Sequence, residues 1–112
     1  MEKSKLKNIP IGVGFYIREE WERFLASASD REKLEDTYDE WLCNLYKGVR
    51  QMRAMGINPK KVVVHLDELI NYCIDHKLKN DSEGRTKFIT DLVLKGRNEE
   101  IDLSNISKDG QQ

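Results

Sequence analysis

The chain has 112 residues, of which 38% are hydrophobic and 35% are charged, and its formal net charge is −1. This length suits one domain with a modest core, and a net charge near zero creates no overall field that would attract nucleic acid or anionic lipid. No apolar run approaches the roughly 20 residues of a membrane-spanning helix. The two cysteines fall inside helical patterns, which is typical of reduced thiols. We therefore expect a cytoplasmic protein that does not bind membranes.

Composition divides the chain into three parts. Residues 1–8 are polar, and we expect this N-terminus to be flexible. Residues 9–96 carry the apolar patterns and are predicted to form a single globular domain. Residues 97–112 form a polar tail with three isolated apolar residues, and we expect this tail to be partly disordered or lightly docked. The isolated residues are Ile101, Leu103 and Ile106.

The globular part begins with apolar residues that alternate from Ile9 to Ile17, which is the period of an extended strand. Gly12 and Gly14 weaken a strand there, so we expect an extended arm or a short edge strand. From Arg18 onward the apolar spacing is helical. The apolar face of this first helix comprises Trp21, Phe24, Leu25 and Ala28.

A long amphipathic helix is predicted next. The tetrad from Ser29 to Glu32 has the form of a capping box, so we expect the helix to begin near Asp30. Gly56 suits a left-handed C-cap, and Cys43, which lies inside the apolar pattern, is expected to be buried. The apolar stripe consists of Leu34, Tyr38, Trp41, Leu45, Gly48, Met52 and Met55.

A short strand over residues 60–66 and two further helices complete the pattern. Three consecutive valines favour a pleated backbone, with Val62, Val64 and Leu66 facing inward. Asp67 is expected to cap the third helix, and Asp81 or Ser82 the fourth, which Gly96 ends. The inner faces comprise Leu69, Ile70, Cys73, Ile74 and Leu78 in the third helix, and Arg85, Phe88, Ile89, Leu92 and Val93 in the fourth.

These elements predict an α+β fold that is mostly α-helical. A helical hairpin over residues 16–56 is followed by a short strand and a second helix pair. A lone strand leaves a row of unpaired backbone groups, so residues 61–66 must pair either with residues 9–17 or with a second subunit. Both pairings remain open, and we expect a homodimer.

The order of strand, helix, turn and helix over residues 60–96 resembles a ribbon-helix-helix DNA-binding domain. The resemblance implies that strands of two subunits enter the major groove, with Lys61, Val63 and His65 facing the bases and Ser82 holding a phosphate. The segment carries little net positive charge, however, and acidic residues flank that serine. DNA binding is therefore the second hypothesis.

Arg85 stands among apolar residues on the fourth helix, where an unpaired charge would be costly. We favour a structural ion pair with Asp81 or with a carboxylate of the long helix. The functional interpretation is an anion-binding arginine beside a helix N-terminus.

Cys73 and His76 could form half of a zinc site, with Cys43 and His65 completing four ligands. No second close pair of ligands accompanies them, so core thiols and ordinary histidines are the favoured interpretation. The sequence contains no nucleophile elbow, phosphate loop or paired-carboxylate motif. We therefore predict a chain that is not an enzyme and has no catalytic residue, cofactor or metal.

Across residues 15–96, the motifs YDEW, LDELINYC and GRTKFI resemble an uncharacterised family of small bacterial proteins. That resemblance implies no activity and indicates that this region is one unit. The function we expect is that of a non-enzymatic interaction or regulatory protein of the bacterial cytoplasm. A dimeric ribbon-helix-helix regulator is the alternative, and an enzyme or zinc protein comes third.

Overall fold

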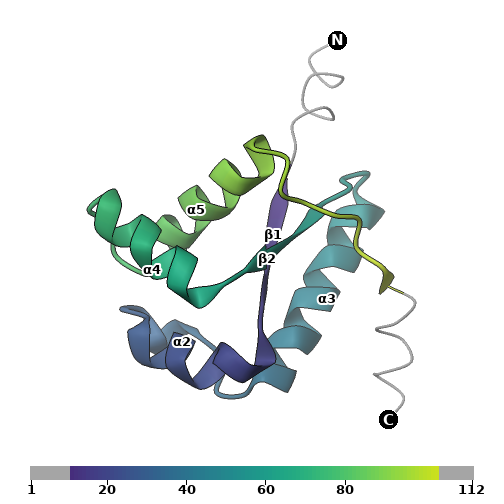
Figure 1. Cartoon of the computed structure of the whole chain (residues 1–112). Coiled ribbons are helices and arrows are strands. Elements are labelled where there is room, and N and C mark those ends of the chain that lie inside the picture. The colour runs from purple at the N-terminus through teal and green to yellow at the C-terminus, as the bar shows by residue number, and fades with distance from the viewer. Residues whose placement is uncertain (1–10, 104–112) are drawn as a thin grey trace.

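The computed structural model describes residues 11–103, and in them the predicted α+β, mostly α-helical fold is confirmed. Two short strands lie at the centre, with α4 and α5 on one side and α3 on the other (Figure 1). In chain order the elements are β1 (Gly12–Tyr16), the 3₁₀ turn η1 (Arg18–Glu20), α2 (Trp21–Ser27), η2 (Arg31–Lys33), α3 (Tyr38–Ala54), β2 (Lys60–Val64), α4 (Leu66–Asp75) and α5 (Ser82–Leu94). The expectations for residues 1–8, Ile9 and Ile106 lie outside the described residues.

The two strands pair in parallel within one chain. Their register runs from Gly12 opposite Lys60 to Tyr16 opposite Val64, and the Lys60 N–H donates to the carbonyl of Ile11 at 2.8 Å. Parallel strands need a long crossover, which α2 and α3 provide here. Of the two pairings that the sequence left open, the structure therefore shows β2 paired with the predicted N-terminal arm.

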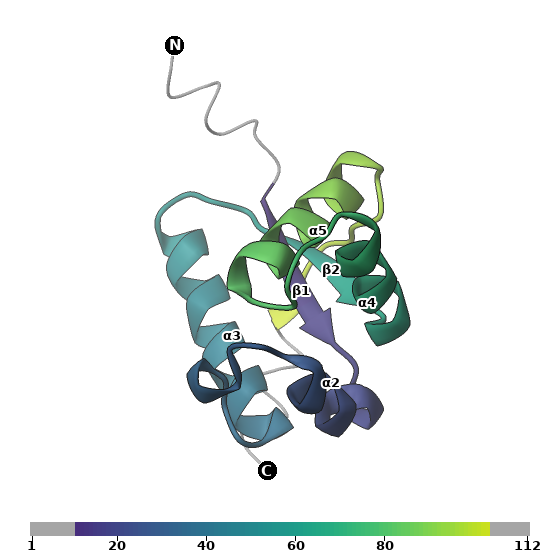
Figure 2. The same cartoon turned by 90° about the vertical axis from the view of Figure 1, so that its left-hand side faces the viewer.

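The glycines of β1 allow α5 to lie directly against the strand. A Cβ atom on Gly12 would lie 2.4 Å from Cγ2 of Val93, and one on Gly14 would lie 2.7 Å from Cδ1 of Ile89. Such distances are far below van der Waals contact, so a side chain at either position would displace the helix. Figure 2 shows α5 lying across the sheet in front of β1. The glycines that weakened the strand prediction are therefore required by helix packing.

The main core joins the face of the sheet that α5 covers to the helices α2, α4 and α5, and Trp41 of α3 also packs into it. Val62, Val64 and Leu66 are almost fully buried, which confirms their predicted inward orientation. Four aromatic rings pack together at the end of β1. They belong to Tyr16 of β1, Trp21 and Phe24 of α2, and Trp41 of α3. The buried members of this core are Trp21, Phe24, Leu25, Trp41, Val62, Val64, Leu66, Leu69, Cys73, Phe88, Leu92 and Val93.

The prediction that the long helix begins near Asp30 was wrong, because α3 begins at Tyr38. Its capping box is formed by Thr37 and Glu40: the Glu40 N–H donates to the Thr37 hydroxyl, and the Thr37 N–H donates to the Glu40 carboxylate. The Ser29 N–H instead donates to the carbonyl of Asn80 at 2.9 Å. Tertiary contacts thus hold the first matching tetrad outside the helix, and the second one caps it.

Three side chains expected on inner faces are exposed instead. Cys43 is exposed, and Ile74 and Met55 are 68% and 70% exposed. In α3 only Trp41 and Val49 are buried, so the buried stripe is narrower than the apolar pattern. Gly56 and Gly96 each have a φ of +85°, which confirms the predicted left-handed position of Gly56 and shows the same conformation at Gly96, which follows α5.

Asp67 does not cap α4, contrary to expectation. His65 precedes the helix without a side-chain cap, and the Leu66 N–H donates to Oε1 of Glu20 at 2.9 Å. A carboxylate from η1 thus satisfies the first turn of α4, and this contact could not be predicted from neighbouring residues. Asp81 caps α5 as predicted, because its Oδ1 accepts from the Gly84 N–H at 2.9 Å.

Candidate interaction sites at the sheet edges

The residues predicted to face DNA do not form a free ribbon. The Lys61 Nζ lies 5.0 Å from the centroid of the Phe15 ring, Val63 is half-buried and His65 is exposed. A two-chain ribbon would need an edge of β2 for the strand of a second copy. One edge of β2 pairs with β1, and Lys61 pairs across the other edge with Glu99. The ribbon-helix-helix resemblance therefore does not extend to the pairing of β2.

The position predicted to hold a phosphate is filled by a carboxylate of the same chain. The Ser82 N–H, in the first turn of α5, donates to Oδ2 of Asp30 at 3.2 Å. An anion at this helix N-terminus would have to displace Asp30, which is itself buried.

Arg85 forms a buried ion pair, as the structural interpretation predicted. Of the two expected kinds of partner, it is not Asp81 but Asp30, the residue near which the long helix was expected to begin and which lies before α3 in the structure. Its two terminal nitrogens donate to Oδ1 and Oδ2 of Asp30 at 3.0 and 2.7 Å, and Nη1 also donates to the carbonyl and Oδ1 of Asn80. Arg85 and Asp30 are only 6% and 8% exposed. The guanidinium holds the pKa of Asp30 below its usual range. This arginine therefore fastens the loop before η2 to the start of α5.

The four candidate zinc ligands do not come together. Cys73 is buried beside the carbonyl of Lys79, the ring of His76 stacks on Tyr72, and Cys43 is exposed on α3. Within residues 11–103, no three histidine, cysteine, aspartate or glutamate side chains are grouped so that they could hold a metal ion.

The two thiols are expected to differ strongly in reactivity. Burial raises the pKa of the Cys73 thiol, whereas Cys43 is exposed. N-ethylmaleimide in native buffer should modify Cys43 rapidly and Cys73 only slowly, and denaturant should abolish the difference. Mass spectrometry of tryptic peptides measures both rates. Equal rates in native buffer would contradict the burial of Cys73.

The outer edge of β1 is one candidate interaction site. Parallel pairing alternates, so the backbone groups of Ile11, Val13 and Phe15 point toward β2. Those of Gly12 and Gly14 point away from β2, and among the described residues they have no hydrogen-bond partner. Both glycines are partly exposed. At the end of the strand, the carbonyl of Tyr16 accepts from the hydroxyl of Tyr38 at 2.6 Å.

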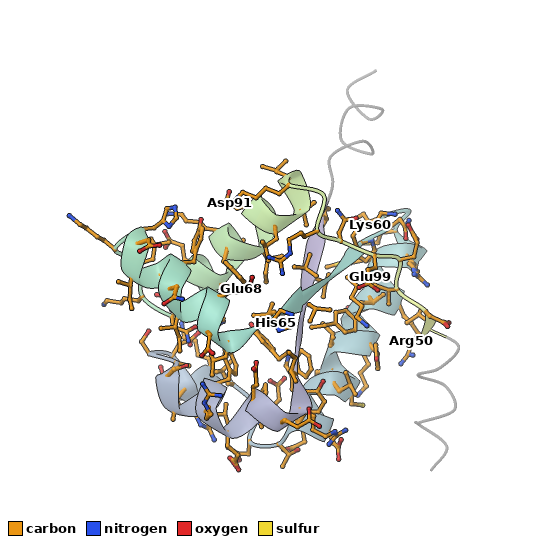
Figure 3. All side chains as sticks on the ribbon, viewed as in Figure 1. Arg50, Lys60, His65, Glu68, Asp91 and Glu99 are labelled. Carbon is orange, nitrogen blue, oxygen red and sulfur yellow. The ribbon has the colours of Figure 1, made fainter. Side chains whose placement is uncertain are left out.

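The outer edge of β2 is a second candidate site, and residues 97–103, which we call the C-terminal segment, cover part of it. Lys61 and Glu99 exchange backbone hydrogen bonds of 2.7 and 2.9 Å. The outward backbone groups of Val63, one pair further along, have no partner among the described residues. Figure 3 shows Lys60 and Glu99 together where this segment crosses β2, and His65 and Glu68 at the other end of the strand.

Beyond Glu99, the C-terminal segment is held by charge and by apolar burial. The Glu100 carboxylate pairs with Lys60, and the carbonyl of Ile101 accepts from Nη2 of Arg53 at 2.6 Å. The Ile101 side chain is 5% exposed and packs with Phe15 and Val49 in a small second core. The expected light docking of the tail is thus a specific contact in residues 97–103.

No protein-family model, curated protein or solved structure matches the chain. The resemblances to a family of small bacterial proteins and to ribbon-helix-helix domains therefore stay predictions. In the part of the chain that the structure describes, no helix is both long and apolar enough to cross a membrane.

Proposed function

We propose that this chain is a non-enzymatic interaction or regulatory protein of the bacterial cytoplasm that works as a homodimer, joined through the outer edges of its two β1 strands. The observation that carries the proposal is the outward backbone of Gly12 and Gly14, which has no hydrogen-bond partner within residues 11–103. An unpaired edge is a ready template for another strand, and proteins that remain monomeric usually protect such edges.

The composition of the strand supports an edge that pairs. Residues 11–17, IGVGFYI, contain no charged residue, although 35% of the chain is charged. Charged side chains, especially lysine, are the common protection of an exposed edge, and here they are missing. The net charge of −1 also leaves little repulsion between two copies.

The edge is complementary to itself around a two-fold axis. If the axis passes beside Val13, each Gly12 would exchange its N–H and C=O hydrogen bonds with Gly14 of the other copy. The two Val13 side chains would then face each other in a non-hydrogen-bonded pair, where cross-strand contact is closest. The result would be one continuous sheet of four strands, with α5 of each copy on its own half.

Charge at Val13 tests the proposal. Light scattering of the wild-type protein should give twice the 13.1 kDa of one chain. Val13→Lys should weaken the dimer about tenfold or more, because like charges would lie directly opposite one another. Val13→Thr, which keeps the shape and adds no charge, should remain dimeric.

Mixing oppositely charged variants separates pairing from folding. Val13→Lys and Val13→Glu should each be folded by circular dichroism and monomeric alone, and together they should form a heterodimer. A wild-type chain that is monomeric at every concentration tested would contradict the proposal, as would a dimer that Val13→Lys leaves unchanged.

A further inference from the structure

We propose that the edge of β2 beside α3 is a recognition site for an extended acidic–apolar segment of a partner protein. In the absence of that partner, the C-terminal segment lies in the site. This inference concerns a different edge from the proposed dimer contact and does not depend on it.

The contacts of the C-terminal segment define the chemistry that the site accepts. The backbone of Lys61 offers one hydrogen-bonded strand pair, to Glu99. The next residue, Glu100, meets the Lys60 ammonium and the amide of Asn58. A bound segment therefore needs one residue that pairs with the backbone of Lys61 and, after it, a residue with a carboxylate. The contacts of Ile101 define the residue that must come third.

The third residue must be aliphatic, and its carbonyl must be placed to accept a hydrogen bond. Ile101 is 5% exposed in a socket formed with Phe15 and Val49. Its carbonyl accepts a hydrogen bond from Nη2 of Arg53 at 2.6 Å, so the site contacts the backbone of the bound segment as well as its side chain. A bound segment with the pattern Glu-Glu-Ile satisfies all of these groups.

The C-terminal segment leaves part of the edge unused. An antiparallel strand that pairs with Lys61 would continue along Val63, whose outward backbone groups have no partner in the described chain. The C-terminal segment cannot continue along Val63, because Gly96 turns the chain at a φ of +85° and Arg97 forms a bidentate ion pair with Glu68. A partner strand that stays extended would make the additional pair. Such strand addition combines backbone hydrogen bonds for affinity with side-chain pockets for specificity.

Two labelled peptides test the site in the full-length chain. The first has the sequence of residues 97–103, RNEEIDL, and the second, VTEEIDL, replaces its first two residues with strand formers that can pair along Val63. Fluorescence anisotropy should show the second peptide binding about tenfold more tightly, the effect of roughly two added hydrogen bonds. Both must compete with an attached segment whose effective concentration is about millimolar. Glu100→Lys, which places a cation against Lys60, should therefore increase the affinity of both peptides about tenfold or more.

Matched variants on α3 place the binding. Arg53→Gln, combined with Glu100→Lys, should weaken both peptides about tenfold. Arg50→Gln, at an exposed arginine one turn earlier on the same helix (labelled in Figure 3), should leave them unchanged. A peptide with Ser in place of Ile should not bind. Ile101→Ser serves as a second way to release the segment, with folding checked by circular dichroism. Failure of both peptides to bind any folded variant would overturn the proposal, as would binding that Arg53→Gln does not affect. Dimer formation measured on the same samples reports separately on the β1 edge.

Discussion

Asp30→Ala is expected to destabilise the protein by about 3 to 5 kcal/mol, because it leaves the guanidinium of Arg85 buried without its charged partner. The carboxylate accepts two hydrogen bonds from Arg85 and one from the Ser82 N–H, and both charged side chains are buried. Urea unfolding followed by tryptophan fluorescence measures the change. A loss below about 1 kcal/mol would contradict a buried ion pair.

Asp36→Ala is the matched control for this prediction. Asp36 pairs with Arg31 at 2.7 Å but is 82% exposed, so its loss should cost less than about 1 kcal/mol. The pH dependence gives a second readout. Because Arg85 lowers the pKa of Asp30, this carboxylate stabilises the fold above the pKa it has in the unfolded chain, and the contribution is lost as pH falls through the lower folded-state pKa. The stability difference between wild type and Asp30→Ala should therefore shrink as pH falls below the usual pKa of an aspartate, about 3.9.

Trp41→Ala is expected to destabilise the protein by about 3 to 5 kcal/mol, the usual cost of truncating a buried tryptophan. Trp41 is 8% exposed, and its ring lies 5.1 Å from that of Tyr16, 5.6 Å from Trp21 and 5.0 Å from Tyr38. These contacts join α3 to β1 and α2. Removing the ring should leave a cavity at their junction, and chemical denaturation measures its cost.

Cys43→Ala is the control on the same helix. Cys43 is exposed, so this variant should unfold within about 0.5 kcal/mol of wild type. If Trp41→Ala were equally mild, α3 would not be anchored through the aromatic cluster.

Periodicity predicted the elements better than their boundaries. The valine run and the spacing around Phe88 identified β2 and α5, because both bury one face against the core. The start of α3 was misplaced because the tetrads beginning at Ser29 and at Thr37 both match a helix-start pattern. Contacts far apart in sequence, between Ser29 and Asn80 and between Asp30 and Ser82, show why the first tetrad does not start the helix.

The candidate sites were less predictable than the fold. Lys61, Val63 and His65 were singled out as the outward side chains of β2, whereas the site proposed at this edge uses the backbone of Lys61 and Val63. Every residue carries the same backbone groups, so sequence cannot indicate which of them lack partners. Glu99 and Ile101 were assigned to a polar tail because a short extended segment has no helical period and gains its stability only from the surface that receives it.

Amide hydrogen exchange at Gly12 and Gly14, measured by NMR at low and high protein concentration, tests directly whether two chains pair through their β1 edges. Both amides should exchange more slowly as concentration rises, because pairing of the two β1 edges would give them hydrogen-bond partners. The amide of Val63 lies on the opposite edge of the sheet and has no partner among residues 11–103, so its exchange should not change with concentration and serves as the internal reference. Val13→Lys should remove the concentration dependence. Exchange at Gly12 and Gly14 that is as fast as at Val63 and independent of concentration would contradict pairing through β1.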